Sequence, residues 1–558
     1  MSIRNLDRLF KPRSVVLVGA SPREGSVGRV IADNLAAAFP GELMFVNPKH
    51  ESLGGRPCWP DVRSLPADPD LAVIAVPAPA VPEVARQLAA RGCAGAVVIS
   101  AGFAERGPEG ERLQAELLAA AEPASLRVIG PNCLGILVPR HGLDASFAHL
   151  RPRPGGIAFV TQSGAIVTSV LDWAHSRGIG FSHLVSLGTM ADVDFGDMLD
   201  FLADDADTSA ILLYVEGIRE PRKFMSAARA ASRMKPVLAV KAGRHEASAR
   251  AARSHTGALA GADAVYEAAF RRAGILRVYS LEALFDAVET LSLTRPARAA
   301  RGETQGGRLA ILTNGGGLGV LAVDALVDEG GRLAELAPET VERLDGVLPG
   351  TWSRANPVDI VGDAPGDRYE EALRALVGDP GVDGVLVINC PTAVVRRTDA
   401  AEAIVRAAGK KLRGPLLTSF VGAETAEEPR ALLRRHGIPT YESPEDAVRA
   451  FMHLVEYGES QRALMQTPPS LPEVIEPDVA SARGIVGRAL EAGIEWLGGP
   501  EAKALLHAYG IPTVPSRTAA DPDEAAEAAA SFGAPVALKI LSPDITHKSD
   551  VGGVLLGL

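Results

Sequence analysis

The sequence contains little cysteine, and none of it is arranged as a disulfide framework or a zinc site. Four cysteines occur in 558 residues, and no two of them form a C-x-x-C pair. They are Cys58, Cys93, Cys133 and Cys390. This usage is typical of a reducing compartment and argues against a structural zinc site.

Long apolar runs are also missing. The segment Val15–Ala20 is short and lacks a cleavage-site context, so it predicts a first β-strand and not a signal peptide. No other apolar stretch approaches the length that spans a membrane. We therefore expect a cytoplasmic protein that has no membrane partner.

An excess of positive charge is absent as well. Lysine and arginine number 57 against 68 acidic residues, which gives a net charge of −11 and argues against a general nucleic-acid partner. The G-x-x-x-x-G-K-[ST] phosphate loop does not occur either, so a nucleoside triphosphate would have to bind through another fold.

What the chain does contain is a repeated alternation of short apolar runs and helical stretches. Such alternation predicts parallel sheets covered by helices, and the length suggests about three to four domains. The pattern restarts after the Pro/Arg-rich segment 150–156 and again at Leu309. We expect α/β domains at about 1–140, 150–295 and 305–457, a linker at 458–495, and a further unit at 496–558.

The first domain carries signs of a nucleotide-type ligand. Its first strand ends in Gly19-Ala20-Ser21, and a helix follows, but the turn departs from G-x-G-x-x-G. Lys49 follows the second strand, where an NAD site would need a carboxylate. These residues favour a phosphate-rich ligand, with coenzyme A ahead of NAD. Val76-Pro77 and Asn132 end later strands and would line the same crevice, although ordinary turn chemistry explains them equally well.

Two later strands lead through small residues into helices, as an anion cradle requires. One has Ser163-Gly164 at the turn, and the other has Asn314-Gly315-Gly316-Gly317. Between them His255 lies among small residues just before a helix, where a neutral imidazole can attack phosphorus. Glu216 ends a strand and would fix the imidazole tautomer if the two meet. The plainer alternatives are a histidine that packs near the helix and a surface glutamate.

Together these motifs resemble the NDP-forming acyl-CoA synthetases, the fused ADP-forming acetate–CoA ligase type of the succinyl-CoA synthetase superfamily. The resemblance covers essentially the whole chain and is most specific at four motifs. These are Ser254–Gly261, Gly130–Gly135, Gln162–Gly164 and His547–Val554. The resemblance implies a Rossmann-like CoA-binding domain, two flavodoxin-like succinyl-CoA-synthetase-type domains and a partial ATP-grasp domain.

The resemblance also implies residue roles and ligands. His255 corresponds to the phosphoryl carrier, Glu216 to its support, Lys539 to a nucleotide-contacting lysine, and His547 to a second relay histidine. The implied reaction converts acyl-CoA, ADP and phosphate to a carboxylic acid, CoA and ATP through an acyl phosphate and a phosphohistidine. The identity of the acid is left open.

The chain departs from the family pattern at its end. A later ATP-grasp lobe with Mg²⁺-binding acidic residues does not occur within these residues, which predicts either a fragment or completion by a partner chain. A homo-oligomer also stays open. The alternative function is a non-catalytic module that senses acyl-CoA or a small ligand, of the type attached to a lysine acetyltransferase.

Overall fold

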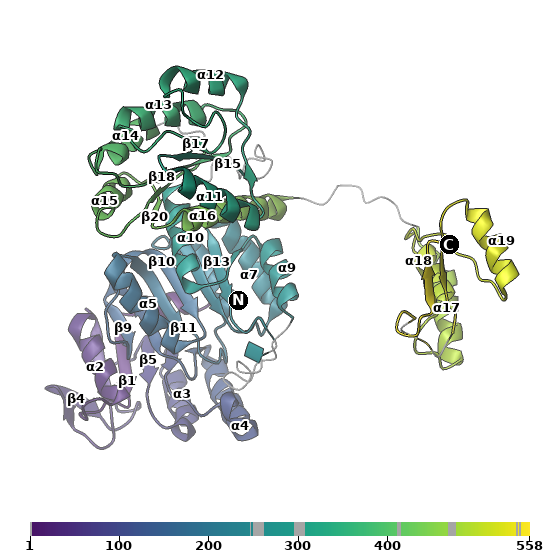
Figure 1. Ribbon diagram of the computed structural model, residues 1–558. Coiled ribbons are helices and arrows are strands. Elements are labelled where there is room, and N and C mark those ends of the chain that lie inside the picture. Colours follow the sequence, from purple (N-terminus) through teal and green to yellow (C-terminus); the bar gives the residue numbers. More distant parts are fainter. Residues whose placement is uncertain are drawn as a thin grey trace. The chain divides into compact units, whose positions relative to one another are not determined.

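The computed structural model describes residues 3–245, 247–248, 262–294, 307–409, 414–466, 476–542, 545 and 548–558. It divides into two compact units, Met1–Gln466 and Thr467–Leu558. The first unit contains three α/β sheets (Figure 1), so the predicted α/β class is confirmed. No helix in the described ranges is long and apolar enough to cross a membrane.

The first sheet has the order β3-β4-β2-β1-β5-β6-β7 and is parallel except for the β3–β4 hairpin. Its strands are β1 (Ser14–Val18), β2 (Glu42–Val46), β3 (Ser52–Leu53), β4 (Arg56–Trp59), β5 (Leu71–Ile74), β6 (Gly95–Val98) and β7 (Arg127–Ile129). The accompanying helices are α1 (Leu6–Phe10), α2 (Val27–Ala38), α3 (Val81–Ala90), α4 (Pro108–Ala121) and the 3₁₀ turns η1 (Ala78–Ala80), η2 (Ala104–Arg106) and η3 (Glu122–Ala124). Both faces of β1 are buried, as expected for a doubly wound parallel sheet.

The second sheet has the order β14-β13-β12-β10-β11-β8-β9. Its strands are β8 (Gly135–Val138), β9 (Leu143–Ser146), β10 (Arg153–Thr161), β11 (Gly180–Ser186), β12 (Ala210–Val215), β13 (Val237–Lys241) and β14 (Leu276–Val278). Its helices are η4 (Pro139–His141), α5 (Gly164–Arg177), α6 (Phe195–Asp204), α7 (Pro221–Met234), α9 (Asp263–Ala273) and α10 (Leu281–Leu293). The β8–β9 hairpin adds antiparallel strands to an otherwise parallel sheet, and the expected boundary near residue 140 falls inside it.

The first two sheets share one hydrophobic core. Leu17 and Val97 of the first sheet belong to the same buried cluster as Val160 and Leu213 of the second. Because this core joins the two sheets, the strand ends of one are held in a fixed relation to the helices of the other.

The third sheet is parallel, with the order β16-β15-β18-β19-β20 and β17 beside β15. Its strands are β15 (Arg308–Thr313), β16 (Arg332–Leu333), β17 (Val358–Asp359), β18 (Gly384–Asn389), β19 (Leu416–Phe420) and β20 (Thr440–Tyr441). Its helices are α11 (Gly316–Asp328), α12 (Pro338–Val347), α13 (Gly366–Val377), α14 (Asp399–Ala408), α15 (Glu427–Arg435) and α16 (Pro444–Met465).

Helix α16 ties the third sheet to the second. Leu454 and Tyr457 of this helix are buried in the same cluster as Phe285 of α10. Gln461 donates a hydrogen bond to the carbonyl of Gly274, which follows α9 (3.2 Å). The third sheet is thus packed onto the helices that follow the end of β13.

The second unit is small and has almost no buried core. It contains α17 (Val479–Glu491), α18 (Gly499–Ala508), α19 (Pro522–Phe532) and the antiparallel strands β21 (Ala537–Lys539) and β22 (Val554–Leu556). Ala482 is its one buried hydrophobic residue among those described, whereas Trp496 is 78% exposed.

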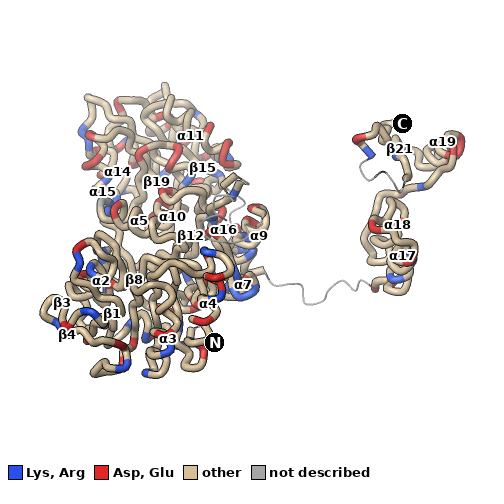
Figure 2. The backbone as a smooth tube through the Cα atoms, turned by 90° about the horizontal axis from the view of Figure 1, so that it is seen from below, with Lys and Arg blue, Asp and Glu red and all other residues tan. Residues whose placement is uncertain are grey.

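Charged side chains are distributed evenly in sign. In Figure 2 lysine and arginine segments are interspersed with aspartate and glutamate segments over residues 3–466.

Candidate active site

The turn after β1 is built for close approach of the backbone. Gly19 has φ 101°, and a Cβ at this position would lie 2.4 Å from the carbonyl oxygen of Ala75. A Cβ on Gly28 would lie 2.1 Å from the carbonyl oxygen of Gly19, so α2 begins directly behind the turn. Only glycine meets both demands.

The predicted residues of this turn lie beside those that follow β2. Asn47 donates a hydrogen bond to the carbonyl of Ala20 (2.5 Å) and accepts one from the backbone N–H of Lys49 (2.8 Å). Ser21 is half-buried and Lys49 is exposed. An exposed lysine beside a tight strand–helix turn has the charge that suits a phosphate group.

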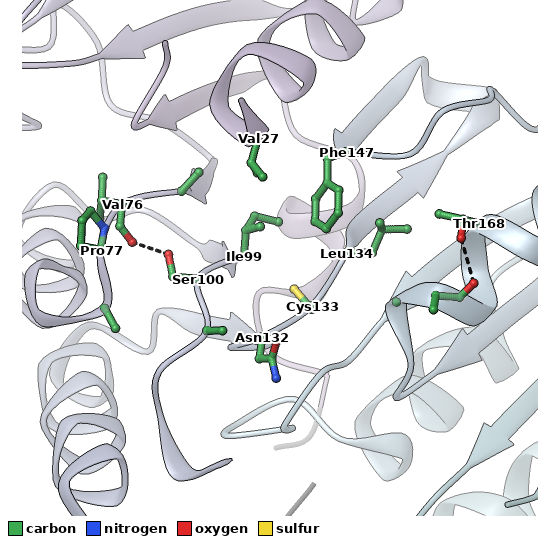
Figure 3. Close-up of a pocket in the computed structure, with 15 residues that line it drawn as sticks. Val27, Val76, Pro77, Ile99, Ser100, Asn132, Cys133, Leu134, Phe147 and Thr168 are labelled. Atoms are coloured by element: carbon green, nitrogen blue, oxygen red, sulfur yellow. Dashed lines mark hydrogen bonds between the residues drawn. The ribbon is translucent and has the colours of Figure 1, made fainter. Parts of the chain in front are cut away.

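Four other predicted residues share one cavity of about 720 Å³ (Figure 3). Val76, Pro77 and Asn132 follow strands of the first sheet, and Gly164 begins α5 of the second. The remaining lining residues are Val27, Ala75, Ala78, Ile99, Ser100, Ala101, Cys133, Leu134, Phe147, Ala165 and Thr168. The cavity therefore connects the carboxyl ends of the first sheet to the N-terminus of a helix that belongs to the second.

The cavity walls carry no charged side chain among the described lining residues. Its positive character comes from the start of α5, where backbone N–H groups lack helical partners and the helix dipole favours an anion. Such a site can hold an uncharged chain along its walls and an anion at one end. Burial raises the pKa of the Cys133 thiol to about 12, so this side chain stays neutral.

The turn before α5 is fixed by its own side chains. Thr161 accepts a hydrogen bond from the N–H of Ser163 (2.9 Å) and donates one to the carbonyl of Ser163 (3.2 Å). Gln162 accepts hydrogen bonds from the N–H groups of Glu216 (2.6 Å) and Gly217 (2.9 Å). The predicted Ser163-Gly164 turn and Glu216 are thereby brought together.

The turn before α11 has the same construction. Thr313 accepts from the N–H of Gly315 (3.0 Å) and donates to its carbonyl (3.0 Å). Asn314 accepts from the N–H of Cys390 (2.7 Å) and donates to its carbonyl (2.9 Å). Gly316 and Gly317 are exposed at the helix start.

Glu216 is half-buried at the end of β12, in a region that contains a buried lysine. Lys241 ends the neighbouring β13, is 3% exposed, and lies over the ring of Tyr266 at 4.6 Å. Burial lowers the pKa of Lys241, and the charge of Glu216 opposes that shift. Sequence reasoning did not select Lys241, because one lysine at a strand end has no distinctive pattern.

The two histidines predicted to carry the phosphoryl group are not among the residues that the structure describes. His255 and His547 lie outside the described residues. Lys539 is exposed on β21, opposite Val554. Among the residues that the structure describes, no group of three histidine, cysteine or acidic side chains could hold a metal ion.

Four family models match the chain in succession. They are a CoA binding domain (residues 13–139), a succinyl-CoA ligase like flavodoxin domain (154–291), a Ligase-CoA domain (309–456) and an ATP-grasp domain (488–558).

Several relatives match this chain over long stretches. An ADP-forming acetate–CoA ligase I of Archaeoglobus fulgidus is 42% identical over 553 residues, which cover 99% of this chain and 78% of the relative. A trans-feruloyl-CoA synthase from an unknown prokaryotic organism is 34% identical and covers 100% of this chain and 77% of its own length. In Pyrococcus furiosus, the α subunit of acetate–CoA ligase I is 38% identical (81% of this chain, 98% of the subunit), and its β subunit is 44% identical over 80 residues (14% and 34%).

A solved structure is similar to this chain in both fold and sequence. The acetyl-coenzyme A synthetase 1 of Ca. Korarchaeum cryptofilum, in complex with phosphate and ADP, has a TM-score of 0.74 and 37% identity. It covers 82% of this chain and 98% of its own.

Proposed function

This chain belongs to the ADP-forming acyl-CoA synthetases of the succinyl-CoA synthetase superfamily and is an acid–CoA ligase, and we propose that it works through an acyl phosphate and a phosphohistidine on His255. In one direction acyl-CoA, ADP and phosphate become a carboxylic acid, CoA and ATP. The observation that carries the proposal is the uncharged cavity that runs from the CoA-binding sheet to the start of α5.

In the first step, a phosphate oxygen forms a bond to the thioester carbon. The carbon–sulfur bond breaks, and the sulfur takes up a proton as free CoA. Gly19, Ala20, Ser21 and Lys49 would bind the phosphates of CoA, and Val76, Pro77 and Asn132 would line the path of its uncharged arm. The start of α5, at Ser163-Gly164, would hold the attacking phosphate through backbone N–H groups, since such groups neutralise anions without a cationic side chain.

In the second step, an imidazole nitrogen of His255 bonds to phosphorus as the phosphorus–oxygen bond to the acyl group breaks and the carboxylic acid leaves. Glu216 would hold the imidazole tautomer and stabilise the ring as positive charge develops on it. The glycine turn Asn314–Gly317 would provide a second set of N–H groups for the phosphoryl group. Positioning and charge neutralisation are the main requirements of such transfers.

In the third step, an ADP oxygen takes the phosphoryl group from the histidine. We propose that Lys539 contacts the nucleotide and that His547 relays the phosphoryl group. Mg²⁺ would assist with charge neutralisation on ligands that a further ATP-grasp segment supplies. Because the P. furiosus relative divides into α and β subunits, a partner chain is one source of that segment.

The test uses this chain with labelled phosphate and a panel of acyl-CoAs. We expect acid-labile, base-stable label on the peptide that contains His255, and only with acyl-CoAs that are substrates. His255→Ala should lose the label while it keeps its CoA affinity, and His436→Ala, a substitution of an exposed histidine that directly follows α15, should keep both. Label that survives His255→Ala would refute the assignment. No label with any acyl-CoA, despite CoA binding, would favour the non-catalytic sensing module.

A further inference from the structure

One aromatic side chain enters the cavity from a loop that the proposed chemistry does not use. Phe147 follows β9, is 37% exposed, and lines the cavity together with Ile99 and Leu134. Figure 3 shows the Phe147 ring between these two side chains, directed toward the space that they border. It is the only aromatic residue among the described lining residues.

The loop that carries Phe147 is anchored on both sides. The side-chain amide of Asn34 on α2 donates hydrogen bonds to the carbonyl of Ser146 (3.0 Å) and to the carbonyl of Ala148 (3.1 Å). The Ser146 hydroxyl donates to Asp144 (2.7 Å) and accepts from the N–H of Ala148 (3.2 Å). Since the residues before and after Phe147 are both tethered, the ring is held in place although part of it is exposed.

The position of Phe147 relates to the acyl side of the cavity. Val76, Pro77 and Ser100 form the wall next to the first sheet, while Gly164, Ala165 and Thr168 form the wall next to α5. A thioester carbon attacked by phosphate at α5 must lie close to the second wall. Figure 3 shows Phe147 and Leu134 between these two walls, and a Cβ on Gly164 would lie 3.2 Å from Cβ of Leu134, so both side chains border the space around the thioester and its acyl group.

The charge of the lining restricts that acyl group. A second carboxylate in this space would lie against apolar side chains without a cationic partner among the described lining residues, which carries a desolvation cost. An apolar chain, in contrast, gains contact with the Phe147 ring and the Leu134 side chain.

From these contacts we propose that Phe147 is a specificity-determining residue, and that the acyl group it selects is an uncharged, apolar one larger than acetyl. The inference rests on the proposed function, because it takes the start of α5 as the phosphate site. Asn34 and Ser146 act through Phe147 and are positioning residues.

Binding measurements test this without turnover, so they give an answer even if no phosphohistidine forms. The dissociation constants of CoA, acetyl-CoA, isobutyryl-CoA, phenylacetyl-CoA and succinyl-CoA are measured by calorimetry on the whole chain. The wild-type protein should bind isobutyryl-CoA and phenylacetyl-CoA more tightly than CoA, and succinyl-CoA more weakly than either. In Phe147→Ala, the affinity for the two apolar acyl-CoAs relative to CoA should fall by at least about tenfold, because even a methylene-sized contact changes discrimination by that order. The affinity for CoA itself should stay within about twofold of the wild-type value.

Phe147→Leu, which keeps an apolar side chain, guards against misfolding and should give an intermediate loss. Val394→Ala, at a residue that is 73% exposed and outside the cavity, is the matched control and should change nothing. The proposal is overturned if Phe147→Ala and Phe147→Leu change CoA and every acyl-CoA equally, or leave all of them unchanged, or if succinyl-CoA binds as tightly as isobutyryl-CoA. A missing phosphohistidine with an intact acyl dependence would instead refute the proposed function alone.

Discussion

The turns before α5 and α11 have the same internal hydrogen bonds but different surroundings. In each, a threonine that ends a strand bonds to the N–H and carbonyl of the residue two positions on. In each, the amide side chain between them reaches the backbone that follows the adjacent strand, at Glu216 in one case and Cys390 in the other. The two sheets thus present two helix starts in equivalent frames.

The neighbours of the two helix starts differ in charge. A Cβ on Gly164 would lie 3.2 Å from Cβ of Leu134, whereas a Cβ on Gly316 would lie 2.7 Å from a carboxylate oxygen of Asp359. A carboxylate near a helix N-terminus already compensates the dipole. The start of α5 therefore borders an apolar cavity whose described lining has no charged side chain, and the start of α11 faces the carboxylate of Asp359.

From this difference we infer that the start of α5 is the stronger anion site. An apolar neighbour also keeps water away and so strengthens the interaction of the N–H groups with a phosphate. The sequence predicted both turns as anion cradles and did not rank them, because a glycine count carries no information about which side chain comes from a distant strand.

The largest effect is expected when a carboxylate is placed beside the start of α5, as Asp359 lies beside the start of α11. Leu134→Asp places a negative charge beside Gly164, and we expect phosphate-dependent labelling of the chain to slow by at least about 100-fold, because two charges near 4 Å apart repel by about 4 kcal/mol at intermediate dielectric. The measurement is the initial rate of labelling at subsaturating phosphate.

Leu134→Asn is the matched control, since asparagine has nearly the same shape as aspartate and carries no charge. It should keep the labelling rate within about tenfold of the wild-type rate. Equal losses in the two variants would mean that packing around the 2%-exposed Leu134 matters, and that charge at α5 does not.

The sequence was informative where one strand or one turn sufficed. The apolar segment Val15–Ala20 predicted a first strand, which the structure has as β1 (Ser14–Val18), and the helix expected after His255 agrees with α9 (Asp263–Ala273). The antiparallel pairing of β8 with β11 was not predicted, because Leu137 and its partner Leu184 lie about 50 residues apart in the sequence. Pairings of that separation leave no local pattern.

The site was predictable in parts. Val76, Asn132 and Gly164 were selected as separate strand and helix ends, and the shared core of the first two sheets brings them to one cavity. Phe147 on a loop and Val27 at the start of α2 were missed, because single exposed apolar residues are common on protein surfaces. Their role depends on a space between two sheets, which no single segment encodes.

A second prediction concerns the pH dependence of the free energy of unfolding, and it involves a buried carboxylate near the cavity beside α5. Asp144, which supports the Phe147 loop, is 5% exposed, and burial raises its pKa from 3.8 to about 6. Between about pH 4 and pH 6 the folded protein binds this proton more tightly than the unfolded chain, so stability falls as pH rises through that window and stays lower above it.

Asp144→Asn removes that cost and keeps an oxygen acceptor for Ser146. We expect the free energy of unfolding to rise by about 2 kcal/mol at pH 8 and to change little at pH 4. Denaturant titrations at the two pH values provide the measurement, with Asp328→Asn, at an exposed position on α11, as the control. An equal gain at both pH values would show that hydrogen bonding and not charge is responsible.

The smallest expected effect concerns α11, where the comparison predicts that removing a carboxylate creates an anion site. Asp359→Asn should strengthen phosphate binding by about threefold to tenfold in a chain whose α5 site is blocked by Leu134→Asp, since helix-end charges contribute about 0.3–1 kcal/mol and partly buried ones more. The N–H of Val361 donates a hydrogen bond to the Asp359 carboxylate (2.9 Å), and the asparagine oxygen can still accept it. Calorimetric titration with phosphate measures the change.

Asp324→Asn removes the same charge from an exposed position further along α11 and should have no effect, because the dipole acts within the first turn. If both substitutions strengthen binding equally, net charge governs the affinity, and the two helix starts differ less than their neighbours indicate.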